Sequence, residues 1–172
     1  LRQKYLDEVL RWDSRGHRSY LDKCQGCDCP APRFRCRDDC MGRWLFCRSC
    51  ILQHHAHTPL HWIEQYFQRM SLKDLGLRVV LNHPPGEHCL LKAPADRDFT
   101  VIHVNGVHNV AVDFCHCPQG QHLEHRQQLM RNGWWPGTPA APQTCATIAC
   151  LRNFIKINAL SKVAVYEYFR AM

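Results

Sequence analysis

Both ends of the chain carry apolar residues at helical spacing. Near the start, apolar and charged residues alternate so that an amphipathic helix is predicted over residues 1–11, packed on the segment that follows. Near the end, apolar stripes predict one helix that begins at Thr144 or Thr147 and a second helix that is capped by Ser161.

Two β-rich runs, residues 99–104 and 107–114, flank the dipeptide Asn105-Gly106. Asn and Gly tolerate the positive φ angles of a two-residue type I′ turn, so this pattern predicts a β-hairpin. In the predicted register Val104 pairs with Val107, and the two runs stay paired along their whole length.

Shorter elements lie on either side of the turn at residues 71–76. Residues 60–64 and 77–81 are predicted strands, the second because β-branched and apolar residues dominate it. Between them, Ser71 is expected to cap a helical turn with Asp74 reaching back to it.

A further helix is predicted over residues 124–131, with Leu129 and Met130 facing inward. After it, Trp134 and Trp135 begin an extended, proline-rich connection. We expect both tryptophans to be buried over a small sheet.

Cysteine and histidine change this picture, because the chain has 12 of each. Eight of them fall in four closely spaced pairs: Cys24, Cys27, Cys36, Cys40, Cys47, Cys50, His55 and His61. Each pair can occupy two corners of a tetrahedron, so the run predicts two Zn²⁺ ions rather than disulfides. Metal-bound thiols point to a reducing compartment, the cytosol or the nucleus. Cys145 and Cys150 have no histidine partner and are predicted core residues.

The order of the pairs predicts a cross-brace, in which pairs one and three hold one ion and pairs two and four hold the other. The first site then consists of Cys24, Cys27, Cys47 and Cys50, and the second of Cys36, Cys40, His55 and His61. This order resembles a B-box or RING-type module, which has little apolar core because metals replace it.

Other ligands fit the same run and stay open. They are Cys29 in place of Cys27, His54 and His57 in place of His55 and His61, and Asp39 in place of Cys40. Thiolate is softer than carboxylate and suits zinc better, which favours Cys40.

A third cluster is predicted from Cys89, Cys115 and Cys117, which together lack one ligand. His83 precedes Cys89 at the five-residue spacing of the last histidine pair, whereas His125 lies in the first turn of a predicted helix. We expect His83 to complete the site, with His125 as the alternative, so that the chain binds three zinc ions.

These elements and sites predict a small, metal-stabilised α+β chain. We expect an N-terminal amphipathic helix in residues 1–22 and a B-box-like two-zinc module in residues 23–70. A hairpin region with the third zinc site follows in residues 71–140. C-terminal helices in residues 141–172 pack on the core or lead into the next domain.

The formal net charge is +7, which nine zinc-bound thiolates and three Zn²⁺ would lower to about +4. This basic balance permits nucleic-acid binding without requiring it. No apolar run approaches the roughly 18–20 residues of a membrane span, so a soluble chain without a membrane partner is expected.

Several short motifs occur in a fixed order along the chain. The first half contains Cys36-Arg37-Asp38-Asp39-Cys40, Cys47-Arg48-Ser49-Cys50, His55, Pro59-Leu60-His61 and Ser71-Leu72-Lys73-Asp74-Leu75-Gly76-Leu77. The second half contains Asn82-His83, Cys89, Asn105-Gly106-Val107-His108, Phe114-Cys115-His116-Cys117, Gln128-Leu129-Met130 and Trp135-Pro136-Gly137-Thr138. This ordered set resembles the CxC-type cysteine-cluster domain associated with fungal KDZ (Kyakuja-Dileera-Zisupton) transposases. That family usually has two residues between its third and fourth cysteines, where this chain has three.

The resemblance implies an accessory domain that lies N-terminal to an RNase H-like transposase region and helps it to bind DNA or chromatin in the nucleus. The expected partners are therefore DNA or chromatin and the rest of the transposase chain, with no small-molecule substrate. Zinc sites filled by protein ligands leave no position for a reactive water, so the chain is predicted not to be an enzyme. The candidate phosphate contacts are Arg33, Arg35, Arg37, Arg43, Arg48, Arg126 and Arg131.

The alternative prediction is a protein–protein interaction module of B-box type, which binds another protein or forms a homo-oligomer. Exposed apolar surface around Trp44, Leu45 and Phe46 would then make the contact.

Overall fold

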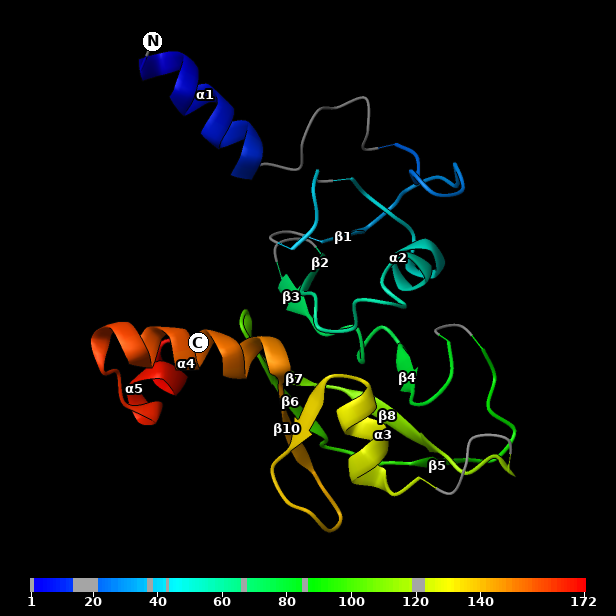
Figure 1. Ribbon diagram of the computed structural model, residues 1–172. Helices are drawn as coiled ribbons and strands as arrows, with labels where there is room; N and C mark the ends of the chain where they lie inside the picture. Colours follow the sequence, from blue (N-terminus) through cyan, green and yellow to red (C-terminus); the bar gives the residue numbers. More distant parts are fainter. Residues whose placement is uncertain are drawn as a thin grey trace. The chain divides into compact units, whose positions relative to one another are not determined.

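The computed structural model describes residues 2–13, 22–36, 39–42, 44–65, 68–84, 87–118 and 123–172. Its elements (Figure 1) are α1 (Arg2–Asp13), β1 (Phe34–Cys36), α2 (Arg48–His54), β2 (Ile63–Gln65), β3 (Gln68–Met70), β4 (Arg78–Val80), β5 (Lys92–Pro94), β6 (Thr100–His103), β7 (Gly106–Asn109), β8 (Ala111–Cys115), α3 (His125–Arg131), β9 (Trp134–Pro136), β10 (Thr144–Thr147), α4 (Ile148–Ser161) and α5 (Val165–Arg170). The chain divides into two compact units, Leu1–Leu77 and Arg78–Met172. The predicted α+β class is confirmed.

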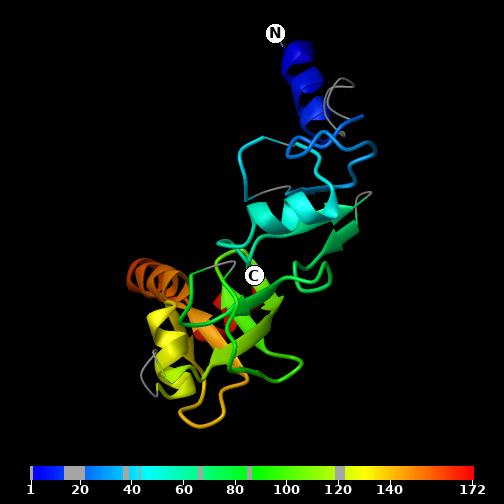
Figure 2. The same cartoon turned by 90° about the vertical axis from the view of Figure 1, so that its right-hand side faces the viewer.

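The first unit is built around a three-stranded antiparallel sheet in the order β1-β2-β3. Helix α2 lies beside this sheet (Figure 2). Its Ile51 joins Cys36, Ile63, Leu72 and Leu75 in the core cluster of the unit. Such a small apolar core leaves much of the stability to other interactions.

A capped turn closes the first unit, as the sequence predicts. The Ser71 hydroxyl donates to the Asp74 carboxylate over 2.7 Å and accepts the Asp74 N–H over 3.1 Å. Gly76 follows with a φ of +95°, a backbone conformation that favours glycine. Because Leu72 and Leu75 fill the core of the first unit, the turn belongs to that unit and not to the hairpin region.

A buried ion pair joins β1 to β2. Arg35 and Glu64 are opposite each other in the sheet, and Arg35 Nη2 lies 2.8 Å from Glu64 Oε2. The two side chains are 4% and 2% exposed. Removing one partner of such a pair leaves a buried, uncompensated charge at a cost of about 3–5 kcal/mol. The prediction of Arg35 as a phosphate contact is therefore wrong, because its side chain is buried and paired.

The second unit contains two sheets. One has the strand order β7-β6-β10-β9, and the other has the order β4-β8-β5. Strands β6 and β10 run parallel, as do β4 and β8. The chain passes from one sheet to the other at Val110, between β7 and β8.

The predicted hairpin exists, but its register is different. His103 pairs with Gly106, so that Val104 and Asn105 form the turn. Asn105 Oδ1 accepts a hydrogen bond from His108 Nε2 over 2.7 Å, which stabilises this turn. The pairing is shifted by two residues, which leaves side chains on their predicted faces. The second run also leaves the hairpin after β7, because β8 pairs with β4 and β5.

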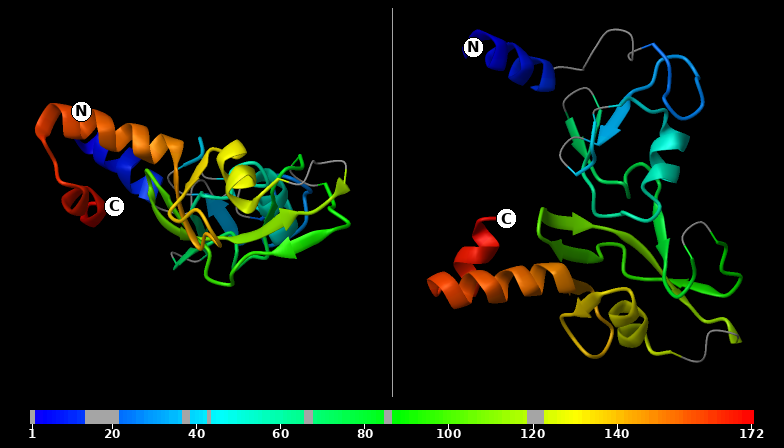
Figure 3. Two further views of the ribbon diagram at one scale, coloured as in Figure 1. Left: turned by 60° about the horizontal axis from the view of Figure 1, so that its bottom comes forward. Right: turned by 45° about the horizontal axis from the view of Figure 1, so that its top comes forward.

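The first C-terminal helix begins after Thr147, one of its two predicted starts, whereas the second begins later than predicted. Residues Thr144–Thr147 form strand β10, and α4 follows, with the Thr147 hydroxyl accepting the N–H of Cys150 over 3.1 Å. Ser161 ends α4 instead of capping the next helix, because Ala164 is the N-cap of α5. Figure 3 shows α5 turning back toward α4.

In each of two pairs of neighbouring residues, one side chain is buried and the other is exposed. Trp134 is buried as predicted, but Trp135 is 51% exposed, since successive residues of strand β9 face opposite sides. Leu129 is buried as predicted, whereas Met130 is 47% exposed. Gln128 is buried beside Leu129 in place of Met130, because adjacent helical residues point about 100° apart.

Helix α1 is amphipathic in sequence, yet its apolar side chains are exposed. The exposed fractions are 65% for Tyr5, 50% for Leu6, 55% for Val9, 58% for Leu10 and 53% for Trp12. The predicted packing of this helix on the next module is therefore wrong for the described part of the chain. No helix within the described ranges is long and apolar enough to cross a membrane.

Candidate metal centres

Three groups of cysteine and histidine side chains converge, and each could hold a metal ion. The first group is Cys24, Cys27, Cys29 and Cys47; the second is Cys36, Cys40, His55 and His61; the third is His83, Cys89, Cys115 and Cys117. Within each group the ligand atoms all lie within 4.8 Å of one another. All twelve cysteines are described, and all are free thiols. Cys145 and Cys150 lie outside the groups and are buried, as predicted.

The first group has one more thiol nearby than a tetrahedral ion needs. The sulfurs of Cys27 and Cys47 lie 3.7 Å apart, and Cys29 shares their group. The thiol of Cys50 interacts with those of Cys24, Cys27 and Cys47. The sequence predicts Cys50 as a ligand and Cys29 only as a substitute for Cys27. The group instead contains Cys29 beside Cys27, and Cys50 lies outside it but interacts with three of its thiols.

Backbone amides point at the sulfurs of the first group. The N–H groups of Gly26 and Cys47 lie 3.4 and 3.2 Å from Cys24 Sγ. Burial raises the pKa of the Cys24 thiol, but these amides outweigh burial and lower its pKa overall. The Ser49 hydroxyl and the Cys50 N–H lower the pKa of Cys47 to about 5. Both effects favour the thiolate, which is the form that binds metal.

The second group combines two thiols with two imidazoles. Cys40 Sγ lies 3.5 Å from His55 Nε2 and 3.4 Å from His61 Nδ1. Cys36 Sγ lies 3.7 Å from His61 Nδ1. Burial lowers the pKa of both histidines, which favours the neutral, metal-binding form. The His55 Nδ1–H donates to the Ile51 carbonyl over 2.9 Å, and this bond directs Nε2 toward the group.

The rival ligands of the second group lie outside it. The Asp39 carboxylate accepts the N–H of Trp62 over 3.1 Å. His54 and His57 are exposed. Of the alternatives left open by the sequence, the geometry therefore favours Cys40 over Asp39, and His55 and His61 over His54 and His57.

The third group lies at one end of the sheet β4-β8-β5. Strand β4 is parallel to β8 and β5 is antiparallel to it, so the end of β4, the end of β8 and the start of β5 meet. His83 follows β4, Cys89 precedes β5, and Cys115 is the last residue of β8. His83 Nε2 lies 3.0 Å from Cys115 Sγ, and Cys89 Sγ lies 3.3 Å from Cys117 Sγ.

His125 does not belong to the third group. Its ring stacks on Phe114, with ring centroids 3.8 Å apart and an interplanar angle of 9°. His83 Nδ1 lies 3.8 Å from the Glu87 carboxylate, a contact that helps to orient a ligating imidazole. The geometry therefore favours His83 over His125.

Gln128 binds the backbone of Cys115 in the third group, and sequence reasoning missed it. Its side-chain amide accepts the Cys115 N–H and donates to the Cys115 carbonyl, each over 2.8 Å. Gln128 is 1% exposed, so these bonds satisfy buried polar groups and fix the backbone of a ligand. The only signal in the sequence is a glutamine beside the inward-facing Leu129.

The donor types and spacings fit tetrahedral zinc. Zn–S bonds of about 2.3 Å and Zn–N bonds of about 2.0 Å place neighbouring ligand atoms roughly 3.3–3.8 Å apart. Six of the separations within the three groups run from 3.0 to 3.7 Å, and all are within 4.8 Å. The first and second groups also alternate along the chain, as a cross-brace requires.

The predicted phosphate contacts have different surroundings. Arg33, Arg48, Arg126 and Arg131 are exposed, and Arg35 is buried. The Arg48 Nε–H also donates to the Leu75 carbonyl over 2.9 Å. Arg37 and Arg43 lie outside the described residues.

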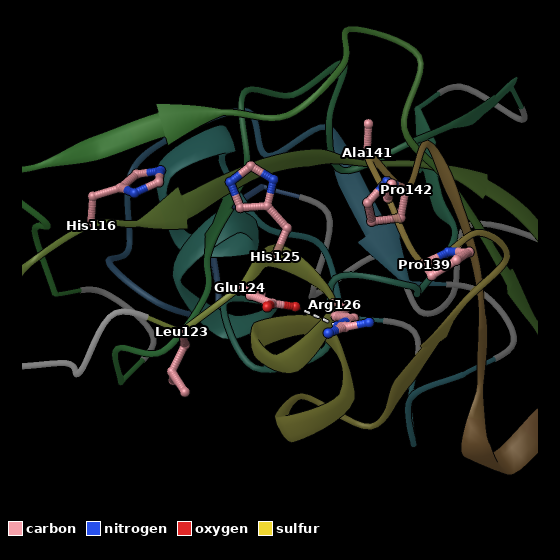
Figure 4. Close-up of a pocket in the computed structure, with 9 residues that line it drawn as sticks. His116, Leu123, Glu124, His125, Arg126, Pro139, Ala141 and Pro142 are labelled. Carbon is pink, nitrogen blue, oxygen red and sulfur yellow. Dashed lines mark ion pairs between the residues drawn. The ribbon is translucent and has the colours of Figure 1, made fainter.

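An open pocket of about 540 Å³ lies in the second unit (Figure 4) and is lined by His116, which lies between Cys115 and Cys117 in the sequence. The figure shows His116 and His125 on one side and Pro139, Ala141 and Pro142 on the other. Arg126 lines the same pocket and forms an ion pair with Glu124. The two imidazole centroids are 5.6 Å apart, so cationic, aromatic and apolar groups meet in one place.

One protein family matches the chain. Residues 72–172, more than half of the sequence, match the family described as CxC2 like cysteine cluster associated with KDZ transposases. The chain belongs to this family. The CxC2-like segment contains the whole third group, whereas the first two groups lie before it. No curated protein and no solved structure matches the chain.

The His83→Ala variant is expected to lose one metal ion per chain, because only three thiols remain in the third group. The His125→Ala variant should keep the metal content of the unaltered chain. Elemental analysis of the purified proteins, normalised to protein concentration, measures the number of metal ions per chain. Loss of the ion from His125→Ala with retention in His83→Ala would reverse the assignment.

The Gln128→Ala variant is expected to weaken zinc binding at the third group by about 10–100-fold, because the Cys115 peptide loses its buried partner. Met130→Ala, on the exposed side of the same helix, is the matched control. Competition with a chromophoric chelator measures both affinities. Equal affinities would show that Gln128 does not support the site.

Proposed function

We propose that the chain is a non-catalytic, zinc-bound accessory domain of a DNA transposase that assists recognition of DNA or chromatin. Membership of a family of cysteine clusters associated with KDZ transposases carries this proposal. Under this proposal, the partners are DNA or chromatin and the rest of a transposase chain, and the protein acts in the nucleus. The free thiols suit such a reducing compartment.

The ligand groups support zinc in a structural role. Thiolates and imidazoles suit this borderline-soft ion. In structural sites zinc is bound by four such ligands in a tetrahedron. Four protein ligands fill that tetrahedron and leave no position for an activated water. Each ion would hold segments of the chain together, and the residues of the chain would make every contact to a partner.

Arg126 is the basic candidate with the most suitable surroundings. It lines the pocket of Figure 4 together with His116 and His125, so a phosphate and an adjacent sugar or base could be contacted in one place. Burial and the neighbouring His116 lower the pKa of His125, so this ring would contribute stacking and hydrogen bonding rather than charge. The Glu124 carboxylate partly offsets the charge of Arg126.

The Arg126→Ala variant is expected to bind duplex DNA more weakly and to reduce the slope of log affinity against log salt by about 1. Arg152→Ala, which removes the same charge from an exposed position on α4, is the matched control. Glu124→Gln should strengthen binding, because it removes a negative charge beside Arg126. Mobility shifts across a salt series measure all three, and affinity that does not depend on salt would refute the proposal.

Self-association or binding of another protein is the second candidate, and α1 favours it. The apolar side chains of this helix are at least half exposed. The contact predicted at Trp44, Leu45 and Phe46 is wrong in part, because Leu45 is buried and Phe46 packs against the core of the first unit. The apolar face of α1 is therefore the better candidate surface.

The Leu10→Glu variant is expected to abolish self-association, because it adds a charge to that face. Ile155→Glu, at a similarly exposed apolar position on α4, is the control and should leave association unchanged. Light scattering over a concentration series measures the mass. A monomer at every concentration of the unaltered chain would exclude this second candidate.

A further inference from the structure

The first metal centre has five cysteines for four positions. The sulfurs of Cys24, Cys27, Cys29 and Cys47 lie within 4.8 Å of one another. The Cys50 thiol interacts with three of these four. The second and third groups each bring together four thiols and imidazoles.

Both surplus candidates are held near the centre by their surroundings. Cys29 lies in a loop in which its carbonyl accepts the N–H of Cys24 over 2.8 Å. Cys50 is in the first turn of α2 and packs against Gly26, where an added Cβ atom would lie 2.8 Å from the Cys50 sulfur. Glycine at this position therefore leaves the space that the Cys50 sulfur occupies.

Cys29 and Cys50 have the same two neighbours at the first centre. Cys29 contacts the thiols of Cys27 and Cys47, and Cys50 contacts the same two thiols. Two sulfurs that meet the same pair of ligands can each complete one tetrahedron, but they cannot both do so around one zinc ion. One of them must stay unbound beside the ion.

We propose that Cys29 and Cys50 alternate as the fourth ligand of one zinc ion that Cys24, Cys27 and Cys47 hold throughout. In each exchange one Zn–S bond forms as another breaks, the entering thiol gives up its proton, and the leaving thiolate takes one up. The charge and the metal content of the centre stay the same. This inference rests on the zinc content of the proposed function.

Exchange makes the first centre kinetically different from the other two. A thiol that already lies beside the ligands could enter as another thiol leaves, so Cys29 and Cys50 would keep the fourth position filled during the exchange. The same entry route serves a thiol from outside the chain. The first centre should therefore give up and regain zinc faster than the second and third centres.

The experiment compares zinc content in the full chain and its variants. The unaltered chain, Cys29→Ser and Cys50→Ser should each bind three ions, whereas the double variant should bind two. Cys36→Ser, the same change in the four-membered second group, should also bind two. Loss of an ion from only one of the two single variants would identify a fixed ligand and overturn the proposal.

A rate measurement tests the exchange itself. Isotopically labelled zinc should replace one ion of the unaltered chain about tenfold faster than in Cys29→Ser or Cys50→Ser, because each single variant keeps only four thiols at the centre. Equal rates in all three proteins would overturn the exchange. An unaltered chain that binds no zinc would instead refute the proposed function, so the two failures are distinguishable.

Discussion

If metal ions fill the first two ligand groups, the bonds between metal and thiolate are the interactions on which the first unit depends. Cys36 shows why, because it belongs both to the apolar core cluster and to the second ligand group. Burial and the neighbouring Cys40 thiol raise the pKa of Cys36 to about 12, so the thiol stays protonated when no cation is near. A bound ion reverses this preference, because it stabilises the thiolate directly. Metal binding and folding of this unit are therefore coupled through one residue.

The second unit differs from the first, because side-chain contacts that need no metal join the strands of its sheet β4-β8-β5. Asp113 on the central strand β8 is 1% exposed and accepts a hydrogen bond from Arg78 Nε on β4 over 2.9 Å. Lys92 Nζ on β5 lies 3.6 Å from the same carboxylate. The hydrogen bond from Arg78 holds the pKa of Asp113 below its usual range. One carboxylate thus joins all three strands that carry the third ligand group, and the sheet sets the ligand geometry.

The sequence predicts the convergence of the ligands better than it predicts the elements between them. Ligand spacing follows from local chain geometry, so short pairs such as Cys36 and Cys40 are visible in one dimension. Strand β10 depends on pairing with the distant strand β6, which local propensity does not encode, and the register of the hairpin depends on the bond between Asn105 and His108. The sequence does not show the role of Gln128 and gives Arg35 a different role, because both roles follow from the partners that burial gives these residues. The sequence offers Cys29 only as an alternative to Cys27, and the distances are needed to place both in one group.

Charge at the metal centres also decides where a DNA surface is favourable. If zinc fills the three groups, four thiolates give the first centre a net charge of about −2, the second is about neutral, and three thiolates give the third about −1. Basic residues near the first centre, such as Arg33 and Arg48, then offset thiolate charge before they can attract phosphate. The Arg48 guanidinium is further engaged with the turn at Leu75. The pocket in the second unit places two imidazole rings beside Arg126, in the unit whose metal centre would be the less negative. For the proposed function it is therefore a better candidate than the arginine-rich first unit that the sequence emphasises.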